Sequence, residues 1–212
     1  MTRRAPLIAL VAPMILTPML ALVAQSPSVT VDVGVSSASV GYYSDEGLIL
    51  RSNGSREAMT FGAEARWRRQ RALSLALGAS LVARGFRSGG EWMNATYADL
   101  AIRGDLQGPG LRSRIRPYLG GGLSIGRRVA CARGGTTVEG EQRDRCDSTG
   151  LAFPAVATWD VSREFRVGVR SKHLRVELIH SRSLVTFQQD PTGLDAKHSV
   201  WLFRVGKCVA RC

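Results

Sequence analysis

Long apolar runs are scarce in this chain once its first 24 residues are passed. Beyond them, no stretch approaches the roughly 20 consecutive apolar residues that a membrane-spanning helix needs. If the rest of the chain enters a membrane, it must do so as a closed β-barrel, because only helices and closed barrels satisfy every backbone polar group in lipid.

Lysine is also scarce, although the chain is strongly basic. The formal net charge is +12, yet only three of the 29 basic residues are lysines, Lys172, Lys197 and Lys207. A basic chain can indicate a nucleic-acid partner, but this one has no aromatic RNA-binding signature, no zinc-finger spacing and no basic helix. We therefore predict no nucleic-acid partner. We expect the arginines to contact anionic lipid head groups, to lie in solvated loops or to line the lumen of a barrel.

Metal-binding and catalytic patterns are missing as well. The three histidines form no metal-spaced pair, the four cysteines lack zinc-site spacing, and the acidic loops lack the spacing of a calcium site. One hydrolase candidate is His180 with Ser181, but a serine–histidine pair also needs an orienting acid, which the sequence does not identify. We predict no metal, no cofactor and no enzymatic activity.

The N-terminus carries a positive and then an apolar segment. Arg3 and Arg4 precede an apolar run over residues 5–24, which ends on a small residue before Gln25. This order predicts a secretory signal peptide over residues 1–24. Three prolines interrupt the run and argue against a membrane-anchoring helix. The length of 212 residues then suits one further domain, which we place at residues 25–207, followed by a short tail at 208–212.

Four cysteines in an exported chain indicate disulfide bonds. Cys131 and Cys146 bracket a polar, glycine-rich stretch, and we predict a bridge between them. It would close a loop of about fifteen residues and contribute roughly 3 kcal/mol in the chain-entropy model. Cys208 and Cys212 would lie about 13 Å apart in an extended strand, too far to bridge. They could pair if the tail turns; otherwise they are free or intermolecular.

Alternation of apolar and polar residues dominates the remaining sequence and predicts an all-β fold. In the clearest segment, residues 72–87, every second residue from Leu73 to Ala83 is leucine or alanine. Ser36 and Ser37 blur the alternation in the first segment and suggest a bulge. The alternating segments are residues 29–42, 59–67, 72–87, 94–104, 114–127, 152–170, 173–186 and 199–205.

These segments predict an eight-stranded antiparallel up-and-down transmembrane β-barrel, because bacterial barrels have even strand numbers. Residues 152–170 are long for one strand, and a turn at 162–164 would give ten strands instead. The longest breaks, 43–57, 132–150 and 188–197, are polar and fit outer loops, while the very short breaks at 68–71 and 171–172 fit periplasmic turns.

The two faces of the strands predict which side meets lipid. The apolar faces carry leucine, valine, alanine and isoleucine, with tryptophan or phenylalanine near the ends, as a membrane barrel requires. The polar faces mix acidic residues with arginine, and such charges can pair inside a narrow barrel. This favours a membrane barrel over a soluble lipocalin-like one. The predicted lumen charge network consists of Glu64, Arg66, Asp99, Arg103, Arg116, Arg175, Glu177 and Arg204.

Several strand patterns resemble the PorT-like outer-membrane β-barrel domain family. They are the residues at 61–66 (FGAEAR), 73–81 (LSLALGASL), 83–86 (ARGF), 116–122 (RPYLGGG), 174–178 (LRVEL) and 200–206 (VWLFRVG). The resemblance covers residues from about 30 to 207 and rests on strand patterns with glycines. It implies an eight-stranded barrel in the cell outer membrane, inserted by the barrel-assembly machinery, with no cofactor and no reaction.

The first functional hypothesis is a small, filled outer-membrane barrel with a structural or surface-interaction role, in contact with outer-membrane lipid and lipopolysaccharide. The second is a narrow porin-like channel, since Gly120, Gly122 and Gly126 on the inward face leave some room. However, eight strands leave an interior that side chains can fill. The third is a lipid-modifying outer-membrane enzyme that uses His180, and a soluble lipocalin-like binding barrel is a further alternative.

Overall fold

A computed structural model of the protein describes residues 26–44, 47–51, 55–68, 72–88, 91–109, 115–137, 140–144, 146, 157–186, 188–189 and 195–212. The predicted signal peptide lies outside these residues, so its cleavage stays a prediction. All regular elements in the described ranges are β-strands. In the same ranges there is no helix long and apolar enough to cross a membrane.

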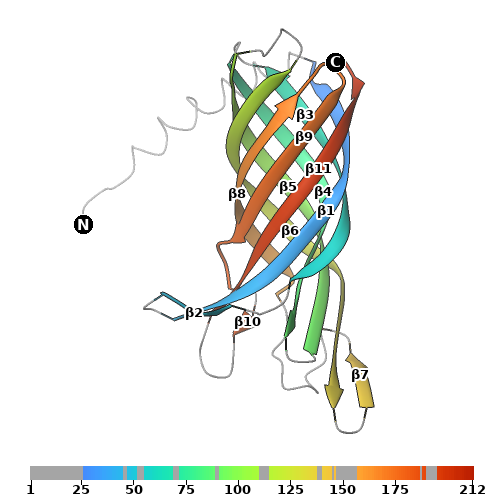
Figure 1. Ribbon diagram of the computed structural model, residues 1–212, viewed down its shortest axis with the longest axis vertical. Coiled ribbons are helices and arrows are strands. Elements are labelled where there is room, and N and C mark those ends of the chain that lie inside the picture. Colours follow the sequence, from blue (N-terminus) through green and yellow to red (C-terminus); the bar gives the residue numbers. More distant parts are fainter. Residues whose placement is uncertain are drawn as a thin grey trace, which may run out of the picture.

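Eight strands close into an antiparallel up-and-down barrel, as predicted (Figure 1). Each strand pairs with the barrel strand before and after it in the chain, and the last pairs back onto the first. Alternation was therefore sufficient to find the strand number. The strands are β1 (Ser28–Ser44), β3 (Arg56–Arg68), β4 (Leu73–Ser88), β5 (Glu91–Gln107), β6 (Arg116–Thr137), β8 (Trp159–Arg170), β9 (Leu174–Ser183) and β11 (Asp195–Ala210).

The two ends of the barrel differ. Three short strands, β2 (Gly47–Arg51), β7 (Gly140–Asp144) and β10 (Gln188–Gln189), pair with β1, β6 and β11 respectively. Figure 1 places all three at the end opposite the C-terminus, which we call the loop end. At the other end, the terminal end, β8 and β9 are joined by only three residues.

Strand pairing corrects several predicted details. Pairing of β1 with β11 continues without a shift from Thr30 to Tyr43, so the bulge predicted at Ser36 and Ser37 is wrong. The shift lies instead between Val29 and Thr30. β8 pairs with β9 from Ser162 to Arg170, so residues 162–164 form no turn and no ten-stranded barrel arises. These details depend on the neighbouring strand, which alternation in a single segment does not reveal.

The barrel is apolar outside and charged inside. Large apolar side chains on all eight barrel strands point outward, and Leu100, with 64% of its surface exposed, is an example. All four tryptophans (Trp67, Trp92, Trp159 and Trp201) occupy outward positions, each next to a buried residue in its strand. The predicted orientation of the two faces is therefore confirmed.

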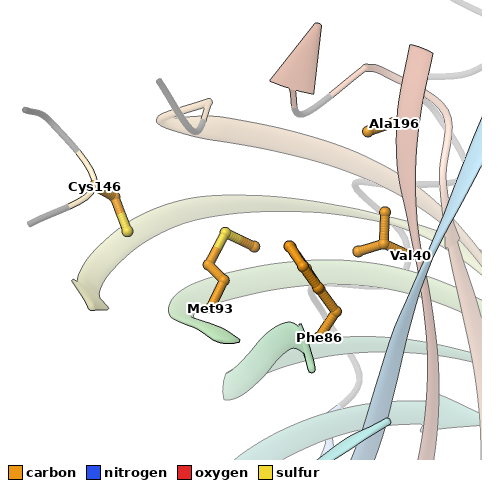
Figure 2. Packing of buried hydrophobic residues seen from close by; sticks show 5 residues of the cluster. All are labelled: Val40, Phe86, Met93, Cys146 and Ala196. Atoms are coloured by element: carbon orange, nitrogen blue, oxygen red, sulfur yellow. The ribbon is translucent and has the colours of Figure 1, made fainter. Parts of the chain in front are cut away.

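Apolar residues fill the lumen at the loop end. Val40, Phe86, Met93 and Ala196 come from four strands and pack together with Cys146, which follows β7 (Figure 2). Phe86 and Met93 face each other in the pairing of β4 with β5. A second buried cluster contains Ala38, Val82, Ile179, Val200 and Leu202. Charge is thus confined mostly to the rest of the lumen.

Candidate functional site

The interior of the barrel holds a balanced set of buried charges. Among the described residues, seven carboxylates and seven arginines are buried. An isolated ion is costly to remove from water, so each of these groups needs partners of opposite charge. The carboxylates are Asp32, Glu64, Asp99, Asp105, Asp160, Glu164 and Glu177, and the arginines are Arg66, Arg84, Arg103, Arg133, Arg166, Arg175 and Arg204.

Glu64 lies at the centre of this set and contacts four guanidinium groups. Arg66 approaches its Oε1 to 2.5 Å and Arg166 approaches its Oε2 to 2.6 Å. Arg103 is 3.3 Å from Oε2, and Arg175 donates a hydrogen bond to Oε1. Glu64 is on β3 and Arg166 on β8, four strands away around the barrel. The contact between them therefore crosses the full width of the lumen.

Two further carboxylates share the same arginines. Asp105 accepts hydrogen bonds from Arg66 at 2.5 Å and from Arg166 at 2.6 Å. Glu164 accepts from the Nε of Arg103 at 2.5 Å and from its Nη2 at 3.2 Å, in a two-point arrangement that is among the stronger ion-pair geometries. Each of these arginines therefore has a second buried acid besides Glu64.

The remaining acids complete the network near β1 and β9. Asp32 receives two hydrogen bonds from the Nη2 of Arg175, at 2.7 and 2.6 Å. The hydroxyl of Tyr118 donates to Glu177 at 2.7 Å, and Glu177 lies 3.5 Å from Arg175. Because Tyr118 is on β6 and Glu177 on β9, this bond also spans part of the lumen.

A second, smaller ionic cluster is centred on Arg84. Its two terminal nitrogens contact Asp99 and Asp160, each at 2.5 Å. Its guanidinium carbon lies 4.6 Å from the ring centre of Tyr97, within the range of a cation–π contact. The hydroxyl of Ser183 donates to Asp160 at 2.7 Å. Arg84 on β4 and Asp160 on β8 are three strands apart, so this link also crosses the interior.

Glycines in the lumen make room for these charges rather than for a channel. A Cβ atom at Gly126 would overlap the carboxylate of Asp99, and one at Gly120 would overlap the carboxylate of Asp105. The room beside these glycines, which supported the porin-like hypothesis, is therefore occupied by side chains.

The structure brings most of the predicted charge network together and separates the rest. Glu64, Arg66, Arg103, Arg175 and Glu177 lie in one connected group. Asp99 belongs to the separate Arg84 cluster.

The two remaining predicted members lie outside the hydrogen bonds and ion pairs given above. Arg204 is buried, but its Nε has no hydrogen-bond partner within the described part of the chain. Arg116 is exposed at the terminal end, because its inward position falls at the first residue of β6.

Several members of the network were not predicted from the sequence. Alternation already placed Arg84 on an inward face, so this signal was present. Glu164 and Arg166 fall in the long segment 152–170, where the sequence also allows a turn at 162–164, and Asp105 follows the segment that ends at residue 104. Alternation places Asp32 on a polar face with the predicted members. The members that sequence reasoning missed are Arg84, Asp105, Asp160, Glu164 and Arg166.

A cavity of about 880 Å³ opens at the terminal end, and we call it the terminal cup. Arg66 and Arg175 line it where it meets the Glu64 network. Strand ends and the C-terminal tail supply the rest of its wall, including Ser28, Thr30, Arg68, Gln107, Arg116, Arg170, Lys172, His173, Arg211 and Cys212.

Both cysteine pairs are disulfide-bonded. Cys131 joins Cys146, and the bridge packs against the apolar cluster at the loop end. Cys208 joins Cys212 with their Cα atoms 5.8 Å apart, because the chain turns at Arg211, whose φ is 52°. Cys208 itself continues β11 and pairs with Thr30 of β1.

His180 does not form the pair that the hydrolase hypothesis required. Ser181 is buried in the lumen, whereas the neighbouring His180 occupies an outward position. Its Nε2 lies 3.1 Å from the hydroxyl of Ser199, and its ring lies 4.5 Å from that of Trp201. Among the described residues, no group of three or more histidine, cysteine or acidic side chains is placed to hold a metal ion.

Comparison with known proteins gives likeness in fold alone. No family model and no curated protein matches the chain, so the resemblance to the PorT-like family stays a prediction. The chain is similar to Ail, the attachment invasion locus protein of Yersinia pestis, with 10% identity over 86% of this chain and 99% of Ail, at a TM-score of 0.45.

Two other solved structures are similar to it. Neisserial surface protein A has 10% identity over 87% of this chain and all of its own, at a TM-score of 0.47. The outer-membrane enzyme PagL has 13% identity over 80% of this chain and 97% of its own, at a TM-score of 0.37.

Proposed function

We propose that this protein is an outer-membrane β-barrel with a filled lumen, which spans the bilayer to hold its loop end at the cell surface. The observation that carries the proposal is the inverted distribution of polarity. Large exposed apolar side chains come from every barrel strand, while the charged side chains lie inside.

A soluble protein would not keep this surface in water. Contiguous apolar patches on soluble monomers rarely exceed a few hundred Å², whereas here the apolar residues continue from strand to strand around the whole barrel. The outward tryptophans suit the interfacial girdle of a membrane barrel. Outer-membrane lipid and lipopolysaccharide are therefore the proposed partners of the apolar surface, and insertion by the barrel-assembly machinery belongs to the same proposal.

The filled lumen argues against a porin-like role. The bonds from Glu64 to Arg166 and from Arg84 to Asp160 cross the interior at two places. The apolar cluster of Phe86 and Met93 occupies the lumen at the loop end. An ion would have to break several buried pairs to pass, and each break leaves an uncompensated charge.

The loop end is the part built for contact with other molecules. β2, β7 and β10 add hairpin-like extensions to the barrel there, and the disulfide between Cys131 and Cys146 fixes one of them. Two of the three strand connections at the terminal end, β3 to β4 and β8 to β9, are short, and three of the four at the loop end are long. This distribution favours a periplasmic terminal end, since outer-membrane barrels carry short periplasmic turns and longer outer loops. A structural or surface-interaction role follows from this orientation.

Reconstitution in lipid vesicles tests the proposal. Vesicles that contain the refolded protein should retain a trapped small ion as well as empty vesicles do, because the lumen is filled. Added protease should cut within residues 138–158 of protein whose loop end faces outward. Rapid ion release would contradict the filled-lumen role and favour the porin-like alternative, and protein that never inserts would contradict the membrane location itself.

A further inference from the structure

The terminal end of the barrel is strongly cationic, and the filled-lumen role does not explain this charge. The strand ends and connections that the structure describes there lie within residues 67–68, 72–73, 106–109, 115–117, 168–174 and 206–212. They contain six basic residues and no acidic one. The basic residues are Arg68, Arg116, Arg170, Lys172, Lys207 and Arg211.

Five of these residues line the terminal cup, whose wall contains no acidic side chain. They are Arg68, Arg116, Arg170, Lys172 and Arg211. Two other arginines of the wall, Arg66 and Arg175, already pair with buried acids of the lumen network. The five residues therefore give the cup a positive charge, and only Arg170 among them has an ion pair with a described acid, Asp105.

Arg170 lines the cup with a guanidinium group whose hydrogen bonds within the protein are incomplete. Its side chain is only 20% exposed, and its nearest acid is Asp105, 3.9 Å from Nη2. Nε and Nη2 are both buried, and neither has a hydrogen-bond partner within the described part of the chain. Its guanidinium carbon lies 5.1 Å from the ring centre of Tyr118, which orients the group. Buried donors of this kind normally have partners.

The C-terminal tail places another guanidinium at the cup. The amide of Cys208 donates to the carbonyl of His173 at 2.9 Å, and the disulfide to Cys212 turns the tail back. Arg211 lies inside this loop with a φ of 52°, a conformation that is uncommon for residues other than glycine. The disulfide thus holds Arg211 beside the cup.

We propose that the terminal cup binds a multivalent phosphate group, carried by a free polyphosphate or by a phospholipid head group. Arginine recognises phosphate through parallel N–H···O bonds. Five cations, of which only Arg170 has an ion pair with a described acid, suit a ligand of several negative charges. A cavity of about 880 Å³ is within the size range of small-ligand sites. The inference does not depend on the proposed function, because a barrel in any location would carry the same cup.

Calorimetric titration of the refolded protein with tripolyphosphate, in neutral detergent free of phospholipid, tests the site. The variant Arg116→Gln/Arg170→Gln should bind at least about tenfold more weakly, because it removes two guanidinium groups that donate charge-assisted hydrogen bonds to the phosphate. The control Arg87→Gln/Arg127→Gln removes the same charge from exposed positions away from the cup and should bind as the unaltered protein does. Heat-modifiability on gels shows that every variant is folded.

A second titration separates the two sources of phosphate. Short-chain phosphatidylglycerol is added to the tripolyphosphate complex, with short-chain phosphatidylcholine as the comparison lipid. Displacement by phosphatidylglycerol alone assigns the cup to an anionic head group, and no displacement assigns it to a free polyphosphate. Absence of tripolyphosphate binding by the folded protein, or equal loss in the two double variants, would overturn the proposal. A failure of the membrane location would appear separately, as protein that folds without detergent.

Discussion

Replacement of Glu64 by glutamine should destabilise the barrel more than any surface change of the same kind. The change removes one negative charge from four guanidinium groups and leaves the side-chain volume almost unaltered. The new amide also directs N–H donors toward groups that can only donate. Breaking a buried ion pair by removing one partner costs about 3–5 kcal/mol, and we expect a loss in this range for Glu64→Gln.

Urea unfolding in detergent micelles, followed by tryptophan fluorescence, measures this loss. With a urea m-value of about 2 kcal/mol per molar, the unfolding midpoint should fall by about 2 M. Glu57→Gln is the matched control, because Glu57 lies on the same strand at an exposed position, and its effect should stay within about 0.5 kcal/mol. Equal midpoints for the two variants would refute a dry, ion-paired lumen and would indicate that water already surrounds Glu64.

A double variant distinguishes the energy of the Glu64–Arg166 interaction from the separate effects of the two single substitutions. Glu64→Gln/Arg166→Gln removes one charge of each sign, so the remaining buried charges are again balanced. We expect the double variant to lose at least 1 kcal/mol less than the two single variants together, within the range of about 0.5–3 kcal/mol measured for residues in contact. Strict additivity would mean that Glu64 and Arg166 do not interact.

Three other substitutions test separate parts of the structure. Gly126→Ala should lower the free energy of unfolding by about 1–3 kcal/mol, because the new Cβ would overlap the Asp99 carboxylate. Gly104→Ala is the control and should be tolerated, because nothing lies within 4 Å of its new Cβ. The urea unfolding midpoints of the two variants test this difference. Leu100→Arg should cost about 2–4 kcal/mol in lipid vesicles, as charges do on the lipid face of membrane barrels, whereas an unchanged midpoint would place Leu100 in water. Cys131→Ser/Cys146→Ser removes a disulfide that contributes roughly 3 kcal/mol in the chain-entropy model, and it should speed proteolysis within residues 132–145. An unchanged cleavage rate would mean that the bridge does not order this loop.

The sequence predicts the barrel well because each strand has its own alternation. The leucines and alanines from Leu73 onward define an outward face without knowledge of any partner strand, and the inward residues follow from it. The prediction of Cys131 with Cys146 also holds, since both flank a single loop. Strand limits are less predictable: β6 continues to Thr137, ten residues past the predicted end, because β5 and β7 pair with it there.

The pairing of charges across the lumen depends on information that no single segment contains. Alternation places Glu64 and Arg166 on inward faces of their strands. Whether the two side chains meet depends on the register of every strand pair between β3 and β8, which a single segment does not contain. Arg116 illustrates the same limit. Alternation places Arg116 on an inward face, but its position along the barrel axis puts it at the terminal cup rather than in the network. Alternation therefore predicts which face of the strand a residue occupies, but it does not predict the position of that residue along the barrel axis.

This chain closes into a barrel, and we propose that its apolar face lies in lipid. The most direct measurement is heat-modifiability of residues 25–212, refolded in detergent micelles and compared on a gel before and after boiling. A closed membrane barrel should give a faster-migrating unboiled band together with a β-type circular dichroism spectrum. Protein that is soluble and monomeric without detergent would contradict the claim, because the ring of exposed leucine, valine and phenylalanine side chains would then have to be stable in water.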